Sequence, residues 1–168
     1  MIYKNLEYLK NLISNSFQCE FSNLQIEKES AEYSACKFIL NIENNKSISI
    51  GFRVAKITPK KVGQFVTLWK RFKNGPIQPY DLSDDIDFFI ISVQKDNNLG
   101  YFIFPKTILH KYGVISKNNQ GGKRAIRLYS PYDNTINEQA KKNQSWQVKY
   151  FINALENEFI DFHKLCLS

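Results

Sequence analysis

Hydrophobic and polar residues recur along this chain at two spacings, which predict its helices and strands. Ile2, Leu6, Leu9 and Ile13 recur at helical spacing and predict an amphipathic first helix over residues 1–17. The next three segments are rich in β-branched and aromatic residues and are separated by short polar links. They predict three strands joined by hairpins, at residues 17–28, 32–42 and 47–57.

Residues 58–73 have the pattern of a second helix. Thr58-Pro59 provides a cap and a first-turn proline, and Asn74-Gly75-Pro76 provides a stop. Between them, apolar residues follow at i, i+3, i+4 and i+7 spacing, namely Val62, Phe65, Val66, Trp69 and Phe72. An inward apolar stripe would leave Lys60, Gln64, Thr67 and Arg71 on the outer face. Gly63 within such a helix costs about 1 kcal/mol relative to Ala, which indicates close packing against a strand or the approach of a ligand.

The second half of the chain predicts a hairpin of residues 86–94 and 99–105, a short helix over 105–110 and a strand over 123–129. Residues 86–94 form the most apolar of these segments, which predicts a central strand. Alternation along 123–129 places Lys123, Arg127 and Tyr129 on one face. A long helix over 137–164 would close the fold. The elements together predict an α+β protein with a mixed or antiparallel sheet flanked by helices, in a single domain spanning residues 1–168.

Composition narrows the class of protein. No apolar run approaches the roughly 18–20 residues that cross a bilayer, and the N-terminal segment lacks a signal-peptide core, so we expect a cytoplasmic protein without membrane contact. Cys19, Cys36 and Cys166 lack the CxxC spacing of a zinc site and are odd in number, which predicts reduced cysteines. Neither His110 nor His163 stands in a pattern typical of a metal ligand or catalytic base. We therefore expect no metal site and no cofactor.

Positive charge is concentrated in two windows of the sequence. Residues 44–80 contain eight Lys or Arg and no Asp or Glu, and residues 97–132 contain six more, again without an acid. The formal net charge of +7 therefore comes from these windows, which also contain all four arginines. If the windows fold onto one face, their summed field would attract a polyanion, and nucleic acid is the first partner to consider. The alternative is that the lysines are solvated charges on helix surfaces.

Several blocks of the chain resemble the MepB family. They cover residues 52–71, 75–81, 87–91, 100–106, 121–133 and 143–151, and the similarity runs from about Glu32 to Phe151. The family's namesake is associated with a multidrug efflux operon, an association that implies no particular reaction.

The order of the predicted elements also resembles the core of the PD-(D/E)xK, or restriction-endonuclease-like, nucleases. That resemblance implies an acid on the second strand, where Glu32 stands, and a (D/E)xK triplet on the third, where Val54-Ala55-Lys56 stands. Lys56 matches the triplet, but Val54 replaces its acid. Because hydrolysis with Mg²⁺ needs clustered carboxylates, the substitution predicts weakened or lost catalysis, with Glu32 and Lys56 as the remaining catalytic candidates. Glu20, Glu27, Glu29, Asp85 and Asp87 are possible replacements among which the sequence does not choose.

Three functions remain open at this point. The favoured one is a nucleic-acid-binding protein on a restriction-endonuclease-like scaffold with a degenerate catalytic motif. The second is a metal-dependent nuclease with displaced acidic ligands, which would require Mg²⁺, and the third is an accessory protein that binds an acidic partner or a small anion. For the first, the expected contact face consists of Arg53, Lys56, Lys60, Gln64, Arg71, Lys123 and Arg127.

Overall fold

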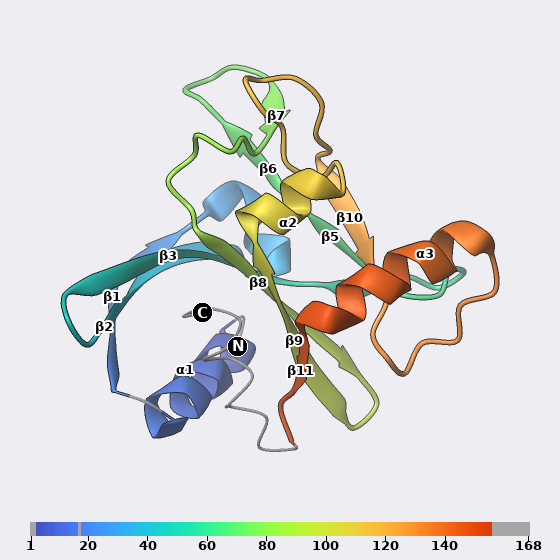
Figure 1. The fold of residues 1–168 in the computed structure, drawn as a ribbon, viewed down its shortest axis with the longest axis horizontal. Coiled ribbons are helices and arrows are strands. Elements are labelled where there is room, and N and C mark those ends of the chain that lie inside the picture. The colour runs from blue at the N-terminus through green and yellow to red at the C-terminus, as the bar shows by residue number, and fades with distance from the viewer. Residues whose placement is uncertain (1–2, 17, 156–168) are drawn as a thin grey trace.

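The computed structural model describes residues 3–16 and 18–155, and Figure 1 shows their arrangement. In chain order the elements are α1 (Lys4–Ser16), β1 (Cys19–Ile26), the 3-10 helix η1 (Lys28–Tyr33), β2 (Cys36–Ile42), β3 (Lys46–Val54), β4 (Lys56–Ile57), β5 (Gln64–Thr67), β6 (Trp69–Arg71), β7 (Ile77–Pro79), β8 (Phe88–Lys95), β9 (Asn98–Pro105), α2 (Lys106–Lys111), β10 (Ala125–Leu128), α3 (Glu138–Gln147), the 3-10 helix η2 (Val148–Tyr150) and β11 (Phe151–Asn153).

A six-stranded mixed sheet forms the centre of the fold, in the order β1-β2-β3-β8-β9-β11. Only β3 and β8 run parallel among its neighbouring strands, and the other pairs are antiparallel. The predicted hairpins and the central position of the most apolar strand are therefore confirmed. The second predicted strand begins at Cys36, because residues 28–33 form η1 instead.

Both faces of this sheet are buried. Leu6, Leu9 and Ile13 of α1 pack against one face together with Ile90 of β8. On the other face, Phe89 and Ile91 of β8 pack with Leu109 of α2 and Trp146 of α3. Successive residues of β8 thus face opposite cores, which explains why this strand shows a continuous apolar run. The α+β class, with a mixed sheet flanked by helices, is confirmed, whereas the resemblance to a restriction-endonuclease-like core is not.

The predicted helix over 58–73 is wrong. The segment follows β4 and forms β5 and β6, with turns and bends between Pro59 and Gly63. Of the five residues in the expected apolar stripe, only Val66 is buried, and Phe72 is 71% exposed. Val66 and Leu68 point into the core at a spacing of two, and β4 and β5 join β10 in a three-stranded sheet, in the order β10-β5-β4. Pairing with β10 thus outweighs the local helical pattern.

The long closing helix is correct only for its first part. The helix α3 ends at Gln147, and after η2 the chain extends into β11, which pairs with β9. The pairing brings Phe151 opposite Phe102. The expected helix continues only as the 3-10 helix η2 at residues 148–150 and is wrong for residues 151–155, and its remainder lies outside the described residues.

The described part of the chain contains two of the three cysteines and one of the two histidines. No helix in that part is long and apolar enough to span a bilayer. Cys36 is buried and Cys19 half-buried, and both are free thiols, while Cys166 lies outside the described residues. The Nδ1 atom of His110 lies 3.0 Å from the Ile115 carbonyl oxygen, and His163 lies outside the described residues.

Candidate nucleic-acid interface

The two acid-free windows meet in the three-stranded sheet. Strand β5 belongs to the first window and β10 to the second, and they pair in antiparallel register from Thr67 opposite Ala125 to Gln64 opposite Leu128. Segments about 60 residues apart in the sequence are thereby joined by backbone hydrogen bonds. The pairing places Arg127 and Lys56 on either side of Phe65, because Phe65 is the register partner of both.

Two aromatic rings, Tyr33 of η1 and Phe65 of β5, lie in a row between two cationic side chains. The Lys56 Nζ atom lies 4.7 Å from the centroid of the Tyr33 ring, whose centroid is 6.4 Å from that of Phe65. On the other side, the Arg127 guanidinium carbon lies 5.9 Å from the Phe65 centroid. Cations at these distances from ring faces are attracted by the ring quadrupole. We call Lys56, Tyr33, Phe65 and Arg127 the cation–aromatic row.

Arg127 also fixes the turn that follows β4. Its Nη1 atom donates to the Thr58 Oγ1 atom at 3.0 Å, to the Gly63 carbonyl at 3.2 Å and to the Val62 carbonyl at 3.4 Å. Gly63 has φ +82°, and a Cβ atom there would lie 2.6 Å from the Leu128 carbonyl oxygen. The close approach of this turn to β10 therefore requires glycine, as expected from the sequence, although the segment is not a helix.

A cavity of about 510 Å³ lies at this end of the sheet. We call it the basic cavity, and it is lined by Lys60, Lys61, Val62, Arg127, Tyr129, Ile136, Asn137, Gln139 and Ala140. No acidic side chain is among the lining residues. Within the described part of the chain, Lys60, Lys61 and Arg127 form no ion pair. Three cations thus face one cavity without a carboxylate to neutralise them.

Other cations of the first window are neutralised. Arg53 pairs with Glu27 at 2.5 Å, Lys56 with Glu32 at 2.9 Å and Arg71 with Glu29 at 3.1 Å. All three acids lie in or next to η1, a segment that precedes the window in the sequence. The first window contains no acid in its sequence, but in the folded protein acids from this preceding segment lie beside its cations.

Two of the expected contact residues are not on the surface. Arg53 is completely buried, where it also donates to the Phe52 carbonyl and to the Tyr80 hydroxyl. Gln64 is buried as well, and its side-chain amide donates to the Gln94 carbonyl at 3.1 Å. The expectation that these two side chains are exposed is therefore wrong. Both lie at strand positions that face the core, and for Gln64 the expected helix had turned the side chain outward.

The remaining expected contact residues fall into two groups. Lys60 and Arg127 line the basic cavity, with Lys56 at the other end of the cation–aromatic row. Lys123 lies beyond the opposite end of β10, next to Arg124, whose Nε atom donates to the Ile77 carbonyl in β7. Arg71 lies in β6, on the same side as β7. Arg71 and Lys123 therefore do not join the basic cavity.

The two catalytic candidates do come together, but without further acids. Glu32 and Lys56 form an exposed ion pair. Among residues 3–16 and 18–155, no three His, Cys, Asp or Glu side chains are grouped so that they could hold a metal ion. The carboxylates that Mg²⁺ would require are therefore not assembled around Glu32 within this part of the chain.

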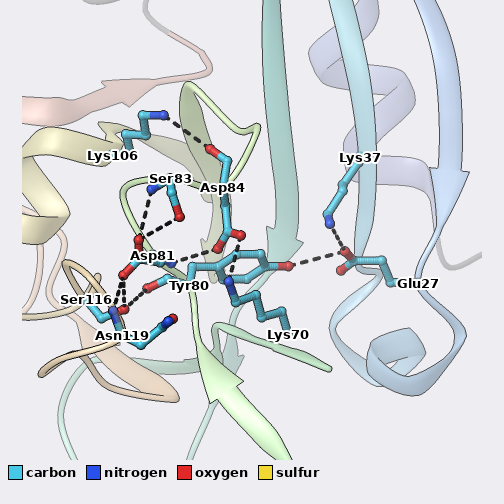
Figure 2. A network of polar contacts seen from close by, with 10 residues as sticks. All are labelled: Glu27, Lys37, Lys70, Tyr80, Asp81, Ser83, Asp84, Lys106, Ser116 and Asn119. Carbon is cyan, nitrogen blue, oxygen red and sulfur yellow. Dashed lines mark hydrogen bonds and ion pairs between the residues drawn. The ribbon is translucent and has the colours of Figure 1, made fainter. Parts of the chain in front are cut away.

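Figure 2 shows a polar network beside β6 and β7, and two of its groups have strongly shifted pKa values. Burial raises the pKa of Tyr80 to about 12, so its hydroxyl is neutral at physiological pH. Asp81 accepts hydrogen bonds from the Ser83 and Asn119 backbone amides and from the Ser116 and Ser83 hydroxyls. These donors, led by the Ser83 amide, hold the pKa of Asp81 well below its ordinary value.

Sequence reasoning missed part of the basic cavity. Lys61 and Gln139 line it, yet neither was among the expected contact residues. The predicted helix over 58–73 placed Lys60 on its outer face and did not include Lys61 in that face. The observed turn instead brings both lysines to the cavity. Over residues 64–68, the apolar residues Val66 and Leu68 alternate with more exposed residues, which is a strand pattern. This pattern was the signal that could have replaced the predicted helix with a strand.

Comparisons with known proteins agree on one family. A family model described as MepB-like matches residues 27–153, which is most of the chain. A solved structure titled "Crystal Structure of MepB" superposes with a TM-score of 0.75 at 34% sequence identity, covering 92% of this chain and 99% of that one. No match was found among curated proteins.

Proposed function

The chain belongs to the MepB-like family, and for this member we propose a nucleic-acid-binding function centred on the basic cavity. The observation that supports the proposal most directly is the set of three unpaired cations, Lys60, Lys61 and Arg127, around a cavity without an acidic lining residue. Lysine and arginine bind phosphate groups through charge-assisted hydrogen bonds, and arginine additionally offers a planar fork of donors.

The cation–aromatic row supports a polymer over an isolated anion. Tyr33 and Phe65 extend from Arg127 toward Lys56, so a cation stands at each end of the pair of rings, and of the two Arg127 has no acidic partner among the described residues whereas Lys56 pairs with Glu32. Each nucleotide of a nucleic acid carries a base beside its phosphate, and the half-buried Phe65 ring next to the Arg127 guanidinium could contact both groups. Nothing in the row selects a base, so we propose binding without strong sequence preference. A cytoplasmic location belongs to this proposal.

A salt titration of the double variant Lys60→Ala, Lys61→Ala tests the proposal. Binding of labelled single-stranded and duplex DNA and RNA is followed by fluorescence anisotropy between about 50 and about 200 mM salt. Each phosphate contact contributes about 0.7–0.9 to the slope of log affinity against log salt. We expect the wild type to bind with a salt-dependent affinity, and the double variant to lose about 1.4–1.8 of that slope.

The matched control is Lys4→Ala, Lys46→Ala. It removes the same charge from two exposed lysines on α1 and β3, away from the cavity. The control should retain most of the slope. No binding of any nucleic acid at about 50 mM salt, or equal losses in both double variants, would contradict the proposal.

The same experiment separates the two alternatives. A metal-dependent nuclease with displaced acids would cleave the labelled strands when Mg²⁺ or Mn²⁺ is added, and Lys56→Ala would abolish the cleavage. An accessory protein for an acidic partner would be stabilised against thermal unfolding by poly-glutamate but not by nucleic acid.

A further inference from the structure

A second cavity, separate from the basic cavity, lies between η1, β2 and β6. It measures about 260 Å³ and is lined by residues from four segments, of which Glu27, Lys28, Lys37, Trp69, Lys70 and Arg71 matter here. We call it the Trp69 cavity. From its lining we propose that it is a binding site for a small planar anion, an aromatic ring that carries a phosphate or a carboxylate.

The polar side of the cavity is rigidly built. Glu27 accepts from the buried Arg53 at 2.5 Å and from the Tyr80 hydroxyl at 3.3 Å, and it pairs with Lys37 at 3.3 Å. Figure 2 shows Lys37, Glu27, Tyr80 and Lys70 arranged along this side. Because Glu27 is shared by two cations, its negative charge is more than compensated. The carboxylate therefore orients its neighbours without making the cavity acidic.

Positive charge exceeds negative charge around the Trp69 cavity. The cations are Lys28, Lys37, Lys70, Arg71 and the buried Arg53, and their acidic partners are Glu27, Glu29 and Asp84. Five cations thus stand against three acids, and Lys28 forms no ion pair among the described residues. A ligand with a negative group would balance this excess and meet at least one cation that has no carboxylate partner.

The indole ring of Trp69 defines the shape of the ligand. Trp69 is half-buried, lines the cavity and carries the Arg71 guanidinium carbon 5.6 Å from its ring centroid. Rings stack on such a surface, and Lys28, which lines the same cavity and forms no ion pair among the described residues, favours an anionic substituent. The volume of about 260 Å³ lies just below the roughly 300–1,000 Å³ of typical ligand pockets, so the occupant is small.

Intrinsic fluorescence provides a direct test, because the chain has only two tryptophans. Trp146 packs on Tyr112 and Phe104, away from the cavity lining, and Trp146→Phe leaves Trp69 as the single reporter. The full chain with this substitution is titrated with adenosine 5′-monophosphate and with benzoate. Adenosine, benzyl alcohol and inorganic phosphate serve as probes that lack either the charge or the ring.

We expect a saturable change in Trp69 fluorescence with adenosine 5′-monophosphate, with benzoate or with both, and the responding probe identifies the acidic group. Lys28→Gln should weaken the binding severalfold without affecting folding, because Lys28 is exposed and unpaired among the described residues. Lys60→Ala, Lys61→Ala should leave it unchanged, which separates this site from the proposed nucleic-acid interface. Three results would each overturn the inference: no saturation by about 10 mM ligand, equal binding of inorganic phosphate alone, or an affinity that Lys28→Gln does not alter.

Discussion

At the scale of single residues, three glutamates decide which cations of the first acid-free window are available. Glu27, Glu29 and Glu32 pair with Arg53, Arg71 and Lys56, and one of these pairs is largely withdrawn from solvent. Arg53 is completely buried and its Nε atom has no hydrogen-bond partner among the described residues. Removal of the acidic partner of such a buried arginine would leave its positive charge without compensation, so the arginine and its partner depend on each other.

We expect Arg53→Met to destabilise the protein by about 1–3 kcal/mol, since it removes the buried donor that Glu27 and the Tyr80 hydroxyl share, while Glu27 keeps Lys37 as a partner. Urea denaturation followed by circular dichroism measures the free energy of unfolding. The matched control is Lys37→Ala, which removes a more exposed partner of the same carboxylate and should cost about 0–1 kcal/mol. Equal losses in the two variants would show that the buried pair has no special role.

At the scale of elements, residues 58–73 show where local pattern and tertiary pairing disagree. The spacing of Val62, Phe65, Val66 and Trp69 fits a helix, yet β5 buries Val66 against the core and pairs with β10. The pairing also requires the turn at Gly63, whose positive φ no β-branched or aromatic residue would adopt readily. Helical periodicity alone could not reveal this, because the partner strand lies about 60 residues further along the chain.

Two glycine substitutions separate backbone strain from close packing. Gly63 and Gly113 both have positive φ, +82° and +76°, but of these two only Gly63 has atoms within 4 Å of the place that a Cβ atom would occupy. Alanine at either site should cost about 1–2 kcal/mol for the left-handed conformation. Gly63→Ala should cost about 1–3 kcal/mol more, through overlap with the Leu128 carbonyl and the Tyr129 ring.

Thermal and urea unfolding of the two glycine variants measures the difference. Gly113→Ala acts as the control, because its added methyl group meets no neighbouring atom within 4 Å. If both variants lose the same stability, the close approach of the turn to β10 is not a tight contact.

At the scale of the whole molecule, distant loops are tied together by buried polar groups. Asp81 follows β7 and accepts hydrogen bonds from Ser116 and Asn119, which lie between α2 and β10. The same carboxylate accepts from Ser83 beside it. These hydrogen bonds fix the connection between β7 and β8 to the loop that precedes β10. The position of β10 therefore depends on residues far from it in the sequence.

The Asp81 carboxylate should make the free energy of unfolding depend on pH under acidic conditions. The pKa of Asp81 in the folded protein lies below its ordinary value of 3.8, because the Ser83 and Asn119 amides and the Ser116 and Ser83 hydroxyls favour the charged form. Its contribution is therefore complete above about pH 5 and is lost as the pH falls from that value toward the folded-state pKa. We expect Asp81→Asn to flatten the decrease in unfolding midpoint between about pH 5 and pH 2.

Thermal unfolding at a series of pH values checks this expectation. Asp85→Asn is the matched control, since it removes an exposed carboxylate from the same acidic segment. The control should follow the wild-type curve. An unchanged acid dependence in Asp81→Asn would mean that its hydrogen bonds do not favour the ionised form.

The sequence by itself determined the first helix, the strands β1, β2, β3, β8 and β9 of the central sheet, the α+β class and the segregation of charge, because each depends on residues close together in the chain. Only the tertiary structure decided that residues 58–73 are strands, that Arg53 and Gln64 are buried, and that Lys60, Lys61 and Arg127 share a cavity. These features depend on the pairing of β5 with β10 and on the ion pairs with η1. The periodicity of a segment does not show which distant segment it pairs with, so local pattern could place the charges along the chain but not against each other.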